Sequence, residues 1–135
     1  MASASPLQSN VIYSDFLSDF SRHPATQDLL KVTNEQSVIN SILKIIKTNN
    51  YEVPYRPSFG ANIYHYLFEP FTRLTISEME QEIKFAIKKY EPRAAINSIN
   101  IGGNPDQNRI DITLVVSILN SPNPVTINTT LTRIR

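Results

Sequence analysis

The chain has 135 residues, a length typical of one domain, and 41% of them are hydrophobic, which excludes a disordered chain. The charges nearly balance, with 13 Lys and Arg against 12 Asp and Glu, so no broad basic surface for nucleic acid or anionic lipid is expected. The absence of cysteine excludes disulfides and thiolate metal sites, and two histidines, His23 and His65, are too few for a histidine-rich metal site.

No segment of the sequence is long and apolar enough to suggest a transmembrane helix. The first ten residues, MASASPLQSN, lack the basic start and apolar core of a secretory signal. We therefore expect a soluble protein that is made and used in a cytoplasm and that needs no cofactor and no metal.

The chain is predicted to begin with an N-terminal arm and connecting segment over residues 1–27, followed by a single domain over residues 28–135. The small and polar residues at the start are typical of a loosely ordered terminus. The stretch VIYSDFLSDF at residues 11–20 is too apolar for a free tail and is expected to pack on the domain or on a partner. The short apolar run DLLKV at residues 28–32 favours a brief strand.

A first helix is predicted over residues 33–50, with Thr33 or Asn34 as its N-terminal cap, because short polar side chains accept hydrogen bonds from the first free amides. One face of this helix is apolar at helical spacing. Its residues are Val38, Ile39, Ile42, Leu43, Ile45 and Ile46.

The next segment, YEVPYRPSFG at residues 51–60, is predicted to be irregular, because its two prolines lack amide donors and Gly60 permits a left-handed turn. Its three aromatic residues indicate an ordered loop pinned to a surface. They are Tyr51, Tyr55 and Phe59. A short helix is expected over residues 62–68, ending before Pro70.

A second long helix is predicted over residues 74–90, where Thr75 and Glu78 match a capping box. Lys88 and Lys89 near its end suit the helix dipole. The predicted buried stripe consists of Ile76, Met79, Ile83, Ala86, Ile87 and Tyr90.

Three strands are predicted after the second helix, at residues 95–101, 109–118 and 125–134. The middle strand alternates apolar and polar residues, as a half-buried strand does. The separators, GGNPDQN and NSPNP, have turn compositions, so the strands should form an antiparallel meander. The fold class is therefore α+β, with two main helices packed on a small antiparallel sheet and an extended N-terminal arm.

Two chemical functions remain as alternatives to a purely structural role. A glycosidase needs two carboxylates across a sugar bond, and the sequence ties no pair of acids together by a motif. The candidate acids are Glu69, Glu78, Glu80, Glu82 and Glu91. A nucleic-acid site would need aromatic and basic residues on one surface, and only Arg56 beside Tyr55 and Arg73 near Phe71 hint at one.

The last predicted strand is a candidate interaction surface, because a terminal strand often lies at a sheet edge, where unpaired backbone groups can accept another strand. It carries no proline between Val125 and Ile134 that would block such pairing. The alternative is that the N-terminal arm covers this edge. One face of the strand is polar, with Thr126, Asn128, Thr130 and Thr132.

A pair of opposite charges flanks the proline that ends the second helix. Pro92 stops the helix and biases Glu91 toward an extended conformation, so Glu91 and Arg93 are held at a rigid corner. Charges held in this way can make hydrogen bonds to a partner with little ordering cost. The alternative is an internal pair that ties helix to sheet.

Four segments in this order resemble a known family. They are the helix SVINSILKIIKT, the loop ending PSFG, the segment LFEPF and the helix ending YEPR, followed by the strand meander. Over residues 28–134 the sequence is similar to the baseplate wedge proteins of contractile-tailed phages that act as sheath initiators, which have relatives in type VI secretion baseplates. Many members carry Gly-Glu-Arg in the loop after the first helix, where this chain has Asn50, Tyr51, Glu52 and Val53. Whether Glu52 and Arg56 replace those charges is left open.

The resemblance implies a structural protein that is not an enzyme, located in the tail baseplate of a virion, although some members were historically labelled lysozymes. It implies contact of Glu91, Pro92 and Arg93 with a core bundle of larger wedge proteins, and a structural role for the loop at Phe59 and Gly60. It also implies that the last strand templates the first ring of tail sheath by strand exchange. The residues expected to take part are Val125, Ile127, Thr130, Leu131 and Ile134.

The partners expected from the resemblance are the larger baseplate wedge proteins and the tail sheath subunit. Tail tube or adaptor proteins are further candidates. Neither nucleic acid nor a membrane is expected as a partner.

Overall fold

The computed structural model describes residues 14–16, 22, 24, 31–33, 35–104, 108–119 and 121–133. The chain divides into two compact units, residues 1–37 and residues 38–135. In the first unit, β1 (Ser14–Phe16) pairs antiparallel with β2 (Lys31–Thr33). The brief strand predicted from residue 28 is therefore found at Lys31–Thr33. Most of the apolar stretch at residues 11–20 lies outside the described residues, so its packing stays a prediction.

Helix α1 (Glu35–Lys47) confirms the first predicted helix, and it buries the apolar face that the spacing indicated. Val38, Ile42 and Ile46 have no exposed surface. The helix ends where the Thr48 hydroxyl donates to the carbonyl of Lys44 over 2.6 Å, which satisfies a carbonyl of the last turn. The predicted cap at Asn34 lies outside the described residues.

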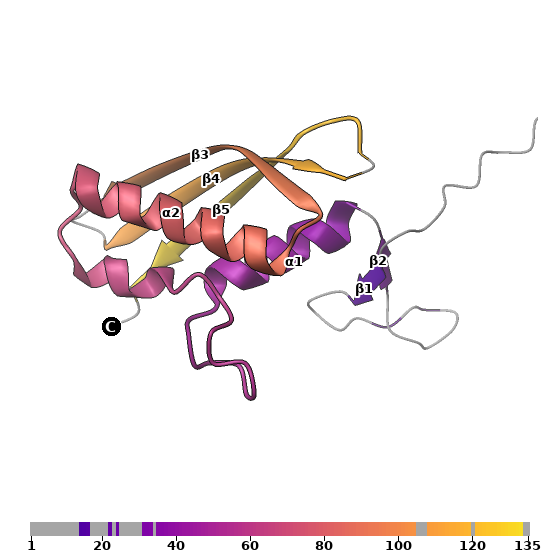
Figure 1. The fold of residues 1–135 in the computed structure, drawn as a ribbon, viewed down its shortest axis with the longest axis horizontal. Helices are drawn as coiled ribbons and strands as arrows, with labels where there is room; N and C mark the ends of the chain where they lie inside the picture. Colours follow the sequence, from indigo (N-terminus) through magenta and orange to yellow (C-terminus); the bar gives the residue numbers. More distant parts are fainter. Residues whose placement is uncertain are drawn as a thin grey trace, which may run out of the picture. The chain divides into compact units, whose positions relative to one another are not determined.

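The loop between α1 and the following 3-10 helix η1 (Ile63–Phe68) leaves the domain and returns to it (Figure 1). Gly60 makes the return possible: its φ is +107°, and a Cβ at this position would lie 2.2 Å from the carbonyl oxygen of Thr48. The next residue, Ala61, donates its amide to the Ile45 carbonyl over 3.0 Å. The predicted left-handed turn and the predicted short helix are both confirmed.

Helix α2 (Arg73–Tyr90) begins one residue earlier than predicted and has a different cap. The cap residue is Thr72, whose hydroxyl oxygen accepts the amide of Thr75 over 3.2 Å. Thr75 is buried inside the first turn and donates its hydroxyl to the Pro70 carbonyl over 2.9 Å. The capping box predicted at Thr75 and Glu78 is therefore wrong, because a threonine three residues earlier already satisfies the free amide.

The second unit contains a three-stranded antiparallel sheet in the order β3 (Ala94–Asn104), β4 (Arg109–Ile118) and β5 (Val125–Thr132). The predicted meander is confirmed, and so is the burial of every second residue of β4. The register of β3 on β4 shifts between Ile96 and Ser98, so Asn97 is an extra residue in a bulge.

Strand β3 is longer than predicted, because it continues through Gly102 and Gly103. The expectation that these glycines form a turn is wrong. A Cβ on Gly103 would lie 2.6 Å from the ring of Phe71, so a glycine here gives room to the aromatic ring.

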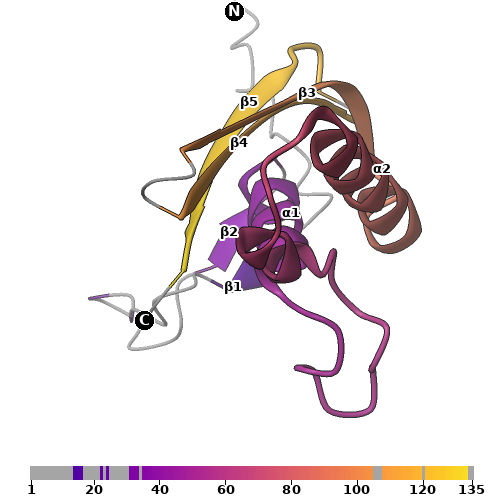
Figure 2. The ribbon, with the colours of Figure 1, turned by 90° about the vertical axis from the view of Figure 1, so that its left-hand side faces the viewer.

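Helices α1 and α2 lie on the same face of the curved sheet (Figure 2). The apolar residues of β4 and β5 turn to these helices, while the opposite face of the sheet is polar. An α+β fold of helices packed on a small antiparallel sheet is thus confirmed. Within the described part of the chain, no helix is long and apolar enough to span a membrane. The largest fully buried hydrophobic side chains include Ile42, Ile45, Ile46, Ile63, Met79, Ile83, Ile87, Ile112, Leu114 and Leu131.

Candidate partner-binding site

The corner after α2 holds a buried carboxylate. Glu91 is 1% exposed, and its two carboxylate oxygens accept hydrogen bonds from the guanidinium of Arg93, one from Nε and one from Nη2 over 2.6 Å. The hydroxyl of Ser41 on α1 also bonds to this carboxylate. Glu91 therefore links the end of α2 to α1 and to the start of β3.

Burial alone would raise the pKa of the Glu91 carboxyl, because it removes water from the charged form. The hydrogen bonds from Arg93 and Ser41, together with the positive charge of Arg93, outweigh this effect and hold the pKa below its ordinary value. Glu91 is thus a carboxylate at neutral pH.

The backbone completes the corner. The Glu91 amide donates to the Ile87 carbonyl over 2.8 Å, and the Glu91 backbone carbonyl accepts from the Ala94 amide over 3.1 Å. Leu119, which follows β4, donates its amide to the Arg93 carbonyl over 2.9 Å. The internal pair that ties helix to sheet, one of the two interpretations of the sequence, is present. Contact of Pro92 and Arg93 with a partner stays a prediction. Both residues are accessible to a partner, since Pro92 is exposed and the Arg93 side chain is 33% exposed.

The loop at Phe59 and Gly60 is fixed to the same end of α2. The Tyr90 hydroxyl donates to the Ser58 carbonyl, and the rings of Phe59 and Tyr90 lie 4.9 Å apart between centroids. The other two aromatic residues of the loop are not pinned, since Tyr51 is 85% and Tyr55 101% exposed. The expectation of three anchored aromatics is wrong for these two. Glu52 stays within the loop, where its carboxylate accepts the backbone amide of Asn49 over 2.8 Å.

Strand β5 lies at one edge of the sheet and, among the described residues, pairs with β4 alone. The register is regular from Val125 to Thr132, so no bulge interrupts the backbone groups along this edge. Ile127 and Leu131 are buried against the helices, so any contact of β5 with a partner strand would run through the backbone. Thr130 lies on the exposed face and donates its hydroxyl to Asp111 over 2.7 Å. Ile134 lies outside the described residues.

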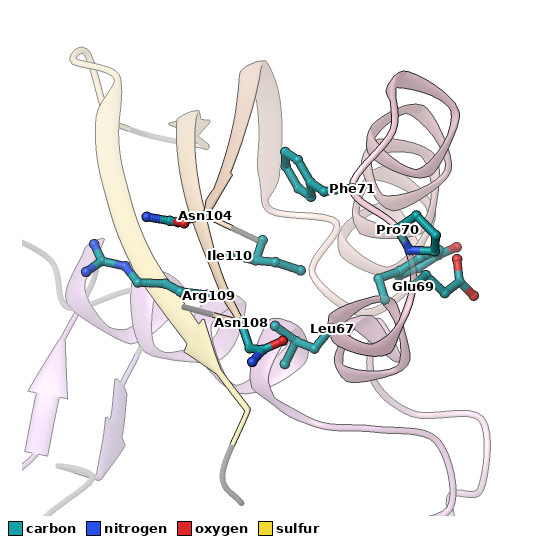
Figure 3. A pocket seen from close by; sticks show the side chains of 9 residues that line it. Leu67, Glu69, Pro70, Phe71, Asn104, Asn108, Arg109 and Ile110 are labelled. Carbon is teal, nitrogen blue, oxygen red and sulfur yellow. The ribbon is translucent and has the colours of Figure 1, made fainter. Parts of the chain in front are cut away.

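A small hollow lies between η1 and the sheet, with Ile110 near Leu67 and Phe71 (Figure 3). Its volume is about 90 Å³, well below the several hundred Å³ typical of ligand pockets. Glu69 is the one carboxylate that lines it. Among the residues that line this hollow, no second acid therefore lies across from Glu69.

The remaining candidate acids lie on or near the solvated face of α2. Glu78 and Glu82 are exposed, and Glu80 lies 3.7 Å from Lys84 in an ion pair one helical turn apart. No group of three or more metal-ligating side chains occurs in the parts of the chain that the structure describes.

Sequence reasoning missed two contributors to this corner, Ser41 and the bond between Tyr90 and Ser58. A serine beside the apolar face of a predicted helix is the one signal that could have pointed to Ser41, because a hydroxyl that is shielded from water needs a partner. Nothing in the sequence connects Tyr90 with Ser58, since that contact depends on how the loop returns.

Comparison with known proteins agrees with this architecture. Residues 32–123 match the family model described as Baseplate wedge protein gp25. The baseplate wedge protein gp25 of Enterobacteria phage T4 is 28% identical over 116 residues, which cover 86% of this chain and 87% of the phage protein.

Three solved structures contain chains with the same fold. One is the baseplate of the anti-feeding prophage, where a chain with 20% identity aligns with a TM-score of 0.71 over 82% of this chain and 89% of its own. A Geobacter sulfurreducens protein, whose description proposes a tail lysozyme, aligns with 22% identity and a TM-score of 0.66 over 75% of this chain and 92% of its own. A chain of the postcontracted pyocin R2 baseplate aligns with 17% identity and a TM-score of 0.59 over 73% of this chain and 96% of its own.

At these identities, the structural likeness concerns the fold alone. The family match, in contrast, spans more than half of the chain and includes α1, α2 and the corner between α2 and β3. It confirms the resemblance seen in the sequence: the chain belongs to the Baseplate wedge protein gp25 family.

Proposed function

We propose that this chain is a structural component of the baseplate wedge of a contractile tail, located in the virion or particle. Family membership supports this role, and so does the likeness of the fold to chains in the anti-feeding prophage and pyocin R2 baseplates. The corner of Glu91, Pro92 and Arg93 faces the core bundle of larger wedge proteins, and the outer edge of β5 templates the first ring of tail sheath.

At the corner, Glu91 has a positioning role, and Pro92 and Arg93 have a contact role. Glu91 is buried and fixes the guanidinium of Arg93, so that Pro92 and the exposed part of Arg93 form the surface that meets the bundle. A guanidinium that is already held by two hydrogen bonds loses little freedom when it binds a further acceptor.

The observation that carries the sheath proposal is the position of β5 at the edge of the sheet with a regular register. Strand addition draws its affinity from backbone hydrogen bonds of about 1 kcal/mol net each, so several bonds must form together. An edge of eight residues with a regular register, Val125 to Thr132, is long enough for such a set.

The test compares Thr130→Pro with Thr130→Ala in assembled baseplates. Both variants lose the hydroxyl bond to Asp111, but only the proline also removes a backbone donor and bends the edge. We expect both variants to enter baseplates, and only the alanine variant to support sheath polymerisation around the tube, as seen by electron microscopy.

Normal sheath on baseplates that contain Thr130→Pro would show that β5 is not the template. Failure of the proline variant to enter baseplates, together with a lowered melting temperature, would show that β5 is needed for the fold itself. Copurification with co-expressed wedge proteins tests the bundle contact separately.

A cell-wall glycosidase is the other candidate, favoured by the description of the Geobacter sulfurreducens protein. A glycosidase acid needs a raised pKa, whereas the hydrogen bonds of Glu91 lower its pKa. Purified protein should leave a peptidoglycan suspension turbid. Clearance that is abolished by Glu91→Gln would overturn the structural assignment.

A further inference from the structure

A second hollow lies beside the corner, where the loop after α1 meets the last turn of α2. We call it the Tyr90 hollow. Its volume is about 400 Å³, in the range of ligand-sized pockets. It is lined by Tyr55, Arg56, Ser58, Phe59, Lys89 and Tyr90.

The wall of the hollow is held in place by the fold. The Tyr90 hydroxyl donates to the Ser58 carbonyl, and the Phe59 ring lies against the Tyr90 ring. The loop is closed at its base by a hydrogen bond from the Tyr51 amide to the Pro57 carbonyl over 2.8 Å. A partner that enters the hollow therefore meets a preformed wall of Ser58, Phe59 and Tyr90, which reduces the entropy lost on binding.

The charge of the hollow has one sign. Arg56 and Lys89 are both exposed, and no carboxylate is among the residues that line it. The Lys89 ammonium lies 5.0 Å from the centre of the Tyr90 ring. The hydrogen bond with the Ser58 side chain and the positive charges of Lys89 and Arg56 lower the pKa of the Tyr90 hydroxyl, so the hollow stabilises negative charge.

Tyr55 adds an aromatic side chain that lies outside the hydrophobic core. It is 101% exposed, and its backbone has a φ of +65°, a conformation that is unfavourable for a bulky residue. The loop holds this ring in solvent at a conformational cost. Exposed tyrosines on rigid surfaces are frequent anchors of protein interfaces.

We propose that the Tyr90 hollow is a docking site for an acidic segment of a partner polypeptide, which places carboxylates against Arg56 and Lys89 and packs an apolar side chain on Tyr55. A protein partner fits better than nucleic acid, because two cations in a chain of net charge +1 neutralise few phosphates. If the proposed function holds, the segment belongs to a neighbouring baseplate protein; binding itself does not depend on that function.

The test uses the full chain and a short fluorescent peptide of repeated Glu-Glu-Tyr units, with anisotropy measured at low and at moderate salt. A peptide of repeated Gln-Gln-Tyr units and a labelled single-stranded DNA are the competing probes. The double variant R56A/K89A should bind the acidic peptide about tenfold more weakly than the original chain. The matched control R73A/K84A also loses two exposed cations, and it should bind as the original chain does.

A charge reversal, R56E/K89E, should transfer the preference to a peptide of repeated Lys-Lys-Tyr units. Equal weakening by both alanine pairs, no binding of the acidic peptide, or tighter binding of DNA through the same residues would each overturn the proposal. Copurification with wedge proteins, measured on the same variants, separates this outcome from failure of the proposed function. Binding of the acidic peptide without copurification would count against the wedge role alone.

Discussion

Replacement of Glu91 by alanine tests the corner most directly. In the folded chain this carboxylate accepts hydrogen bonds from Arg93 and from Ser41 and is 1% exposed. The substitution removes these bonds, leaves a cavity, and deprives a partly buried guanidinium of its acceptor.

Breaking a buried ion pair by removal of one partner costs about 3 to 5 kcal/mol. The Arg93 side chain is 33% exposed, so water can solvate part of the guanidinium after its acceptor is removed. We therefore expect a smaller loss, of about 2 to 3 kcal/mol in the free energy of unfolding. Domains have a total stability of about 5 to 15 kcal/mol, so the variant should still fold, with a melting temperature lowered by about 10 °C.

The assay is urea unfolding followed by circular dichroism, with Glu82→Ala as the matched control, because Glu82 is an exposed glutamate on the same helix. A double-mutant cycle of Glu91→Ala with Arg93→Ala isolates the coupling between the two side chains. If Glu91→Ala costs no more than Glu82→Ala, the carboxylate does not hold the corner and the argument is refuted.

The pH dependence supplies an independent check. The folded-state pKa of Glu91 lies below its usual value of 4.5, so the unfolded chain binds this proton more readily than the folded chain. The stabilisation is therefore fully present above the unfolded pKa and is lost as the pH falls through the folded pKa. The difference in the free energy of unfolding between the original chain and Glu91→Gln should shrink as the pH falls below the usual glutamate pKa of 4.5.

Two glycine substitutions test the close approaches of the backbone. Gly60→Ala should lower the free energy of unfolding by about 3 kcal/mol or more, because the new Cβ would lie 2.2 Å from the carbonyl oxygen of Thr48 at a φ of +107°; a near-neutral result in urea unfolding would contradict this. Gly103→Ala should cost about 1 to 2 kcal/mol, because the ring of Phe71 must move. Gly102→Ala, whose Cβ would have no neighbour within 4 Å, should be close to neutral in the same assay.

The elements with regular periodicity could be predicted from the sequence, because burial of one face dictates their spacing. The alternation along β4 and the helical spacing in α1 and α2 both correspond to the observed core. Strand β3 was harder, since Ile96 and Ile99 are three residues apart and a regular strand would place them on opposite faces. The bulge at Asn97 brings both onto the face of the helices, so the irregular spacing itself was the signal.

Features that depend on how the fold brings separate segments together could not be predicted from the sequence. The choice of Thr72 as cap of α2, where Thr75 was expected, is set by how the chain leaves Pro70, and the Thr75 hydroxyl is used for that carbonyl. The sequence predicted a charged pair at the corner, but the hydrogen bond to Glu91 from Ser41, fifty positions earlier in the chain, could not be foreseen. Periodicity carries no information about such distant contacts.

The buried carboxylate also bears on how the Glu-Pro-Arg signature behaves under mutation during evolution. Glu91 bonds to groups of the same chain, so selection for a stable fold would retain it even in a relative whose neighbours in the particle had diverged. Pro92 is exposed and the Arg93 side chain is 33% exposed, so both are more accessible to solvent than the glutamate. Selection for folding therefore acts on the glutamate of this motif, whether or not its neighbours in the motif meet a partner.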